Sequence, residues 1–279
     1  MAEGILNYEV YNDRMRRSMW DKAFFMDKIP LTEAVVDYGC ADGSLIRFLQ
    51  GLFPGTYFVG FDIDETMVAA ANADRRENTW FFTDPEAVRE KLRELGVAPE
   101  RTAVNFSSVF HEIFAYHADP EGIRRFLETL NPRYIVVRDM MYRSADEAEA
   151  LDPETEAAVR GLLPRDLTAD FEAVFGSIRL RKNLTHLLLK IDYTENWPRE
   201  CPEDYFSVSP ERLAEILNPD GRFRTLYEAR YTLPWVRLAA ERRFGIDLGS
   251  QTTTHIAMIL ERRSGPSPIS LDNHRTASK

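Results

Sequence analysis

The fold is decided by one stretch of the chain, VVDYGCADGS at residues 35–44, which runs directly into LIRFL at residues 45–49. The first part has the composition of a buried strand, the middle is a turn of small residues, and the last part has helical spacing. Gly39 can adopt a positive φ, while Ala41 and Gly43 keep bulky side chains away from the backbone. The start of the helix also offers free amide groups. This stretch therefore predicts a strand, a ligand-binding turn and a helix.

The spacing of the small residues distinguishes this turn from a dinucleotide-binding turn. A dinucleotide fingerprint has glycine at offsets zero, two and five. Here Gly39, Ala41 and Gly43 fall at offsets zero, two and four, and Ser44 stands at offset five. The pattern therefore favours a different ligand from NAD or FAD.

The chain around this turn alternates strand and helix patterns from residue 34 to residue 139. Apolar residues at three- and four-residue spacing predict helices at residues 86–95 and 121–130. Repeated strand-helix-strand units form parallel sheets with helices on both faces. The sequence therefore predicts an α/β fold with a doubly wound, mostly parallel sheet. Short runs of β-branched and aromatic residues give its strands, at residues 34–38, 57–61, 79–82, 102–106 and 134–138.

Carboxylates stand at the ends of the second and third predicted strands. Asp62 follows the glycine turn by about twenty residues, a position from which a carboxylate can accept hydrogen bonds from a ribose diol. Thr83 and Asp84 close the third strand, where a side chain can reach an adenine edge. Taken singly, each carboxylate is explained equally well as a helix N-cap or a surface turn. Because ligands of open parallel sheets bind beyond the carboxyl ends of strands, the ordered set favours a nucleoside site.

With these motifs the chain resembles the class I S-adenosylmethionine-dependent methyltransferases over approximately residues 34–140. The resemblance rests on Asp37-x-Gly39-x-Ala41-x-Gly43, on Asp62 and Thr83-Asp84, and on NFSSVFHEI at residues 105–113 after the fourth strand. It implies a seven-stranded sheet with one reversed edge strand and S-adenosylmethionine lying across residues 39–43. Ala41 departs from the family, in which glycine is common at this position.

The resemblance also implies roles for single residues. Asp62 would hold the ribose, Ile63 would flank the adenine and Asp84 would meet its amino group. The segment at residues 105–113 would lie beside the reactive methyl group. The complete cofactor-binding set predicted in this way is Asp37, Gly39, Cys40, Ala41, Gly43, Asp62, Ile63, Thr83, Asp84 and Ser107.

His111 and Glu112 are the predicted catalytic residues. Methyl transfer to a protonated acceptor can require a base, and histidine titrates near neutral pH. His111 is therefore the candidate general base, with Glu112 orienting it or binding the acceptor; alternatively, His111 caps or packs the following helix. His111, Glu112 and His117 could also help to hold magnesium, as in some RNA 2′-O-methyltransferases, although we expect no metal. Ala115 excludes a His-Glu-x-x-His zinc motif.

A second polar cluster, YTENWPRE at residues 193–200, continues to Tyr205. Trp197 and Tyr205 could stack on a flat acceptor or shield a methylammonium-like centre, unless the cluster is a surface loop that covers the core. Tyr11, Arg14 and Ser18 of the opening segment share a helical face and could close over the cofactor, unless they simply pack against the core. The predicted substrate-binding set is Tyr11, Arg14, Asn196, Trp197, Arg199 and Tyr205.

Outside the repeated units, the apolar face of residues 1–30 predicts a helical lid, and residues 31–263 form the main domain. An insertion at about residues 144–180, rich in Ala, Glu and Leu, predicts two helices that cover one side of the site. Residues 184–191 and 254–260 are expected to be strands at the sheet edge. The small and polar residues 264–279 predict a disordered tail.

Composition limits the classes of function. Of the 279 residues, 44% are hydrophobic and 29% charged, and the net charge of −10 disfavours nonspecific binding of nucleic acid. The two cysteines cannot form a disulfide framework, so we expect a cytoplasmic protein, and no run approaches the length of a membrane helix. We therefore expect a methyltransferase acting on oxygen or nitrogen of a small molecule or natural product. The alternatives are an RNA or protein methyltransferase and a non-catalytic module that binds S-adenosylmethionine and regulates a partner.

Overall fold

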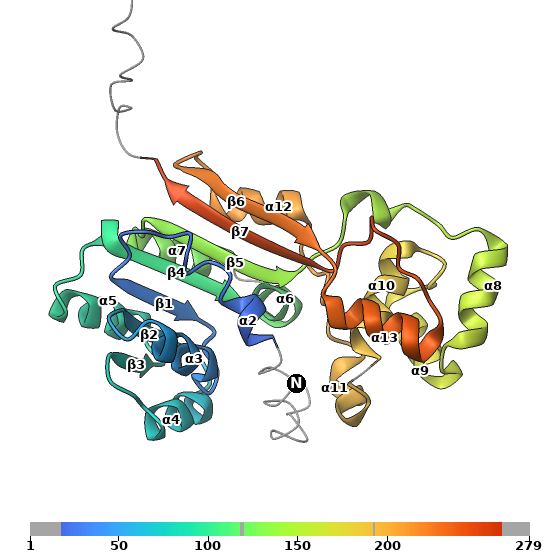
Figure 1. Ribbon diagram of the computed structural model, residues 1–279, viewed down its shortest axis with the longest axis horizontal. Coiled ribbons are helices and arrows are strands. Elements are labelled where there is room, and N and C mark those ends of the chain that lie inside the picture. The colour runs from blue at the N-terminus through green and yellow to red at the C-terminus, as the bar shows by residue number, and fades with distance from the viewer. Residues whose placement is uncertain (1–17, 118–119, 192, 264–279) are drawn as a thin grey trace, which may run out of the picture.

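The computed structural model describes residues 18–117, 120–191 and 193–263 (Figure 1). In this part of the chain one sheet has the strand order β3-β2-β1-β4-β5-β7-β6. β7 runs antiparallel to both of its neighbours, and all the other neighbouring pairs are parallel. The strands are β1 (Ala34–Tyr38), β2 (Tyr57–Phe61), β3 (Thr79–Phe82), β4 (Thr102–Ser107), β5 (Tyr134–Met140), β6 (Phe223–Tyr231) and β7 (His255–Arg262).

This sheet confirms the predicted fold class, including the five strands expected between residues 34 and 138. It is also the sheet implied by the resemblance to the class I methyltransferases, with one difference in detail. The reversed strand is β7, which lies between β5 and β6 rather than at the edge. The edge is formed by β6, which the sequence analysis did not predict. The side chains of β6 are mostly exposed, so its sequence lacks the apolar run that marks a buried strand.

Helices cover both faces of the sheet. On one face, α5, α7 and α12 pack against a core that includes Val36, Val104 and Ile135. On the other face, α2, α3 and α4 pack against a core that includes Val35, Phe58 and Val136. Neighbouring residues of a strand thus enter opposite cores, as expected for a sheet buried on both sides. The helices are α2 (Met19–Lys22), α3 (Ser44–Leu52), α4 (Glu65–Ala73), α5 (Pro85–Glu94), α7 (Pro120–Leu130) and α12 (Pro210–Leu217).

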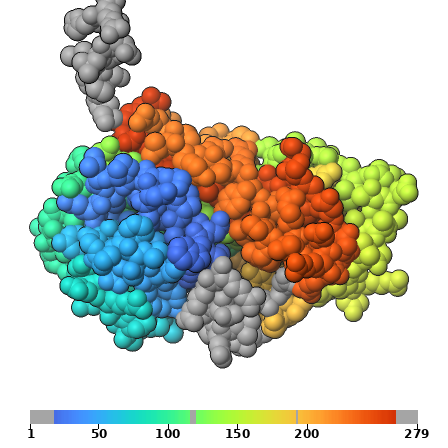
Figure 2. All heavy atoms as spheres, viewed as in Figure 1, coloured from blue at the N-terminus to red at the C-terminus, as the bar shows by residue number. Residues whose placement is uncertain are grey.

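A second group of helices lies beside the sheet, past the end of β5 and the start of β7 (Figure 1). These helices share a hydrophobic core of their own, built around Phe171, Ile178 and Leu187. In Figure 2 the early part of this group is the yellow-green region on the right of the molecule. The group, called here the helical lobe, consists of η3 (Ser144–Glu147), α8 (Pro153–Leu162), α9 (Arg165–Phe175), α10 (Arg181–Lys190), η4 (Thr194–Asn196), α11 (Trp197–Glu200) and α13 (Pro234–Phe244).

The prediction of a strand at residues 184–191 is wrong, because these residues belong to α10 and the turn that follows it. Every residue of the helix from Asn183 to Lys190 is buried. A segment that is buried on all sides loses the periodicity that separates a helix from a strand. The strand expected at residues 254–260 is β7, but it lies one position in from the sheet edge.

The expected lid and tail fall partly or wholly outside the described residues, namely at residues 1–17 and 264–279. The described part of the N-terminal segment contributes Phe25 and Ile29 to the core shared with α3. None of the helices in the described part of the chain is long and apolar enough to cross a membrane.

Candidate functional site

The turn between β1 and α3 is held against the end of β2. Gly39 and Cys40 donate backbone hydrogen bonds of 2.8 and 3.0 Å to the Phe61 carbonyl. Gly39, Ala41 and Gly43 have φ angles of 77°, 46° and 75°, so the backbone is left-handed at alternate positions. A Cβ atom at Gly39 would lie only 2.5 Å from Val109 Cγ2. Glycine is therefore required at position 39 by both conformation and packing.

Asp62 lies directly beside this turn. Its Oδ2 accepts a hydrogen bond of 2.8 Å from the Ala41 amide, and its Oδ1 accepts one of 3.0 Å from the Asp64 amide. Burial raises the pKa of this half-buried carboxyl group, while the two amides favour its charged form. A carboxylate oxygen can accept more than one hydrogen bond, so Asp62 can still bind a ligand hydroxyl group.

Three of the predicted cofactor residues are buried beneath the turn. Asp37 accepts a hydrogen bond of 2.7 Å from Asn105 Nδ2, and burial raises the pKa of Asp37 to about 7. The Cys40 side chain packs next to Gly60, where an added Cβ would lie 2.7 Å from the sulfur. Ser107 ends β4, and its buried Oγ has no hydrogen-bond partner among the described residues. Asp37 and Cys40 thus support the turn, whereas the Ser107 hydroxyl retains an unused hydrogen-bonding capacity.

The remaining predicted cofactor residues are exposed at the ends of β2 and β3. Ile63 is 64% exposed and stands between the carboxylates of Asp62 and Asp64, so its side chain is accessible to a ligand. Asp84 accepts a hydrogen bond of 3.0 Å from the Glu86 amide and so caps α5, as the alternative interpretation of a single carboxylate supposed. Thr83 and Asp84 are both exposed, which leaves their outer atoms accessible to a ligand.

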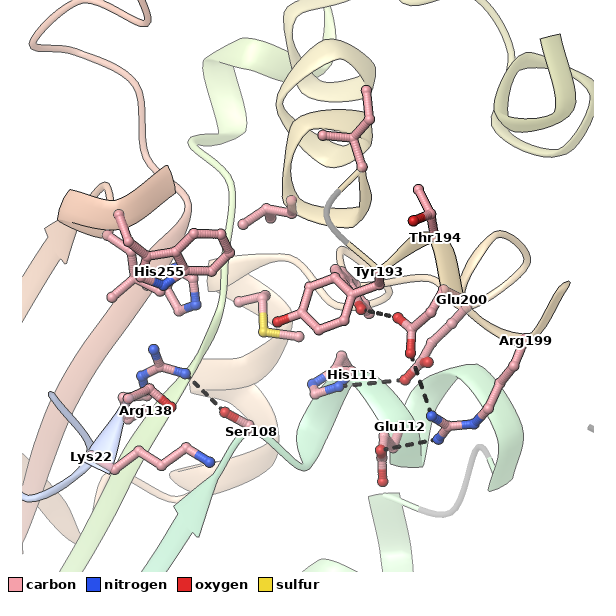
Figure 3. Close-up of a pocket in the computed structure, with 18 of the residues that line it drawn as sticks. Lys22, Ser108, His111, Glu112, Arg138, Tyr193, Thr194, Arg199, Glu200 and His255 are labelled. Carbon is pink, nitrogen blue, oxygen red and sulfur yellow. Dashed lines mark hydrogen bonds and ion pairs between the residues drawn. The ribbon is translucent and has the colours of Figure 1, made fainter. Parts of the chain in front are cut away.

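A cavity of about 610 Å³ lies between the carboxyl ends of β4 and β5 and the helical lobe (Figure 3). The sheet side contributes Ser108, His111 and Arg138, and α2 contributes Lys22. The helical lobe contributes side chains from α10, from residues 193–205 and from α13. The cavity adjoins the glycine turn, because Val109, which contacts Gly39, precedes His111 by two residues.

Asp139 orients His111. Nδ1 of the buried His111 ring lies 2.7 Å from Asp139 Oδ1. Asp139 is itself fixed by the backbone amides of Val109, Phe110 and Met140, at 2.9, 2.7 and 2.7 Å. The orienting carboxylate is therefore at the end of β5. Of the two roles predicted for Glu112, orienting His111 falls to Asp139, and binding the acceptor stays a prediction. A signal for this pairing was present in the sequence. His111 follows the predicted strand at residues 102–106, and Asp139 follows the next predicted strand, at residues 134–138.

The other ring nitrogen of His111 points toward Glu203. Its Nε2 lies 3.5 Å from Glu203 Oε1, and the Tyr205 ring packs edge-on with its centroid 5.4 Å from that of His111. Burial by itself would lower the pKa of His111, but the charges of Asp139 and Glu203 outweigh it and raise the pKa to about 9. Burial raises the pKa of Glu203 to about 7. His111 therefore bridges two buried carboxyl groups.

Acidic side chains of the helical lobe continue this wall of the cavity. Arg199 Nη2 lies 3.7 Å from Glu112 Oε1, and its Nη1 lies 3.5 Å from Glu200 Oε1. The Tyr205 hydroxyl donates to Glu200. The Lys190 ammonium group lies over the Tyr205 ring at 4.0 Å from its centroid. Burial raises the pKa of Glu112, and the charges of His111 and Arg199 oppose this shift.

Only part of the predicted substrate-binding set lines the cavity. Arg199 and Tyr205 do so. Trp197 is buried in the helical lobe, where its Nε1 donates a hydrogen bond of 3.0 Å to Asp170 Oδ2. Asn196 is also buried away from the cavity wall. Their predicted contact with a substrate is therefore not supported, because the helical turns of this segment direct Tyr193, Thr194 and Glu195 to the cavity instead. Tyr11 and Arg14 lie outside the described residues.

One group of side chains in the described part of the chain has the chemistry of a metal site. Ligand atoms of His111, Glu112 and Glu203 lie within 4.8 Å of one another. The sequence analysis had considered His117 as the third ligand, but the side chain of His117 is outside the described atoms. A cation here would compete with Arg199 for Glu112 and with the proton on His111.

Comparison with known proteins found no matching family model and no matching curated protein. Among solved structures, the plantazolicin methyltransferase BamL, in complex with a triazolic desmethylPZN analog and SAH, is similar with 12% identity and a TM-score of 0.49, over 90% of this chain and 88% of that one. A SAM-dependent methyltransferase from Anabaena variabilis ATCC 29413 has 14% identity and a TM-score of 0.49, over 94% and 98%. A SAM-dependent methyltransferase from Archaeoglobus fulgidus has 16% identity and a TM-score of 0.46, over 92% and 100%.

Proposed function

We propose that this chain is an S-adenosylmethionine-dependent methyltransferase that acts on oxygen or nitrogen of a small molecule. The observation that carries the proposal is that the glycine turn packs against the same short segment of the chain that supplies the candidate base to the cavity. Gly39 packs against Val109, and His111 projects into the cavity two residues later. A cofactor bound along the turn would thus present a reactive group to a ligand in the cavity.

The residues of the turn fit the nucleoside end of S-adenosylmethionine. The left-handed backbone at Gly39, Ala41 and Gly43 forms a cradle without large side chains. Asp62 would bind the ribose hydroxyl groups, Ile63 and Asp84 would contact the adenine, and the unused Ser107 hydroxyl would face the amino-acid end. When bound, this cofactor supplies an electrophilic methyl group on a sulfonium ion.

His111 would remove the proton of the acceptor. Its Nε2 lies on the cavity side, while Asp139 holds Nδ1 and stabilises the imidazolium ion that forms. Glu203, at 3.5 Å from Nε2, can accept a hydrogen bond from the protonated ring. Arg199 and the imidazolium ion already balance the nearby carboxylates, so we propose that the reaction uses no metal ion.

The rate should depend on pH through His111. Only the neutral imidazole accepts a proton, and the pKa of His111 in the ligand-free protein is about 9. We therefore expect kcat/KM to rise between pH 7 and 9 and then to level off. The effect on stability has the opposite sign: a pKa raised above the unfolded value of about 6.5 stabilises the fold below that pH, and this contribution is lost as the pH rises through 9.

Rates of methyl transfer measured across this pH range would check the predicted rise in kcat/KM. Thermal unfolding recorded in the same buffers would check the predicted loss of stability. A kcat/KM profile that is flat or falls between pH 7 and 9 would contradict the assignment of His111 as the base.

The cavity favours a small acceptor. Its volume of about 610 Å³ lies within the roughly 300–1,000 Å³ typical of small-molecule sites. The net charge of −10 also disfavours binding to the phosphate backbone of a nucleic acid. These two features support a small-molecule acceptor rather than an RNA.

The proposed function can be tested without knowing the acceptor. The protein is incubated with methyl-labelled S-adenosylmethionine and a cell extract, which is then passed through a filter that retains proteins and RNA. We expect the label in a small molecule of the filtrate that chromatography separates from the cofactor, and we expect the His111→Ala variant to leave the label in the cofactor. Label retained in RNA or protein would favour the polymer-modifying alternatives, and tight cofactor binding without transfer to any fraction would favour a non-catalytic module.

A further inference from the structure

Two buried cations occupy the end of the cavity nearest the sheet. Arg138 is 2% exposed and Lys22 is 3% exposed, and both line the cavity. Arg138 Nε lies 2.6 Å from Asp21 Oδ2, and its Nη1 donates a hydrogen bond of 2.8 Å to Ser108 Oγ. The buried Nη2 has no hydrogen-bond partner among the described residues. The guanidinium group is thus rigidly held with one donor nitrogen unused.

Lys22 and Arg138 lie close enough to influence each other's charge. Burial and the charge of Arg138 lower the pKa of Lys22 to about 8, while the carboxylates of Asp37, Asp139 and Glu112 act in the opposite direction. Asp21 is the carboxylate in direct contact with Arg138, and it also accepts hydrogen bonds of 2.9 Å from the Tyr231 hydroxyl. These carboxylates leave Arg138 Nη2 without a hydrogen-bond partner among the described residues, so this nitrogen can donate to an anion at this end of the cavity.

We propose that Arg138 and Lys22 bind a carboxylate group of the methyl acceptor, so that the substrate is a small carboxylic acid. This inference rests on the proposed function. The acid would lie with its carboxylate at Arg138 and its nucleophilic oxygen or nitrogen at His111. Figure 3 shows Lys22, Arg138 and Ser108 together on one side of His111, and Glu112, Glu200 and Arg199 on the other. On that other side Arg199 is already engaged by Glu112 and Glu200, which favours the orientation with the carboxylate at Arg138.

The position of Arg138 favours the acceptor over the cofactor as the source of the carboxylate. Arg138 is on β5, which β4 separates from β1 and its glycine turn. Two strand spacings correspond to roughly 10 Å. Within the described residues, the cavity wall includes Arg138, Lys22 and His111 but neither residues 39–43 nor Asp62. The two cations therefore share a compartment with the candidate base and not with the nucleoside site.

The test uses protein saturated with S-adenosylhomocysteine and matched pairs of probes. 3-Hydroxybenzoate and 3-(indol-3-yl)propanoate are compared with their primary amides by calorimetry. We expect at least one acid to bind about tenfold more tightly than its amide, and Arg138→Gln to abolish that preference, because a charge-assisted hydrogen bond is lost. Arg243→Gln is the matched control, since Arg243 lines the cavity from α13. It should change the preference by less than about twofold.

Three results would overturn the proposal. The first is that no acid binds more tightly than its amide. The second is that Arg138→Gln has no more effect than Arg243→Gln. The third is that Arg138→Gln weakens S-adenosylhomocysteine about tenfold but leaves 5′-methylthioadenosine unchanged, since the carboxylate bound would then be that of the cofactor.

Lys22→Gln provides a second variant if Arg138→Gln does not fold. It should reduce the acid preference at least about threefold, and an undiminished preference would count against the proposal. Failure of the wild-type protein to bind S-adenosylhomocysteine at all would refute the proposed function itself. That result is distinguishable from each of the outcomes on the probes.

Discussion

Replacing His111 with alanine is expected to lower turnover by about 10²-fold to 10³-fold while leaving the affinity for S-adenosylhomocysteine within about twofold. The ring is buried at the cavity wall, so its loss removes the proton acceptor without touching the glycine turn. Turnover of the acceptor and calorimetric affinity for the product are the two measurements. A rate within about twofold of the wild type would refute the general-base assignment.

Two further variants separate chemistry from packing at this position. His255 also lines the cavity, and its Nδ1 lies 2.8 Å from Thr254 Oγ1. His255→Asn should lower the rate by less than about fivefold, because it changes the wall and not the base. Asp139→Asn removes the charge that raises the pKa of His111. It should therefore move the rise in kcat/KM to lower pH, a shift that a purely structural role of Asp139 would not produce.

Replacing Asp62 with alanine is expected to weaken the binding of S-adenosylmethionine and S-adenosylhomocysteine by roughly tenfold to a hundredfold. Two effects contribute to the loss. The variant lacks the proposed charge-assisted hydrogen bonds to the ribose, and the Ala41 amide loses its partner at 2.8 Å, which loosens the turn. 5′-Methylthioadenosine carries the same ribose, so Asp62→Ala should weaken its binding to the same extent. A substitution that affects only the amino-acid end of the cofactor would leave the binding of 5′-methylthioadenosine unchanged.

Asp64→Ala is the matched control for Asp62. Asp64 is the N-cap of α4, where its side chain accepts hydrogen bonds from the Thr66 and Met67 amides. Its loss should destabilise the fold by about 1 kcal/mol but change cofactor affinity by less than about threefold. An unchanged calorimetric affinity in Asp62→Ala would show that this carboxylate has no role in the cofactor site.

The central fold followed from the sequence because its signals are local. Runs such as AVVDY at residues 34–38 are short, apolar and flanked by small or polar residues, which is sufficient to predict a strand. Successive parallel strands bring their carboxyl ends to one edge of the sheet. The contact between Asp62 and the Ala41 amide could therefore be anticipated from the order of the motifs alone.

The partners of His111 could not be derived in the same way. Asp139 is 28 residues away and Glu203 belongs to the helical lobe, so both contacts depend on how separate elements pack. The pKa of His111 follows from those contacts and from burial, and neither is a property of the segment at residues 105–113.

The sequence by itself determined the doubly wound sheet, the glycine turn and the candidate base, since each depends on residues that are neighbours along the chain or at the ends of adjacent strands. The tertiary structure alone decided that α10 is a helix of the helical lobe, because residues 183–190 are all buried and carry no period. It also decided that Tyr193 and not Trp197 faces the cavity, and that Lys22 and Arg138 meet there. Such pairings depend on packing between distant segments, which local patterns do not encode.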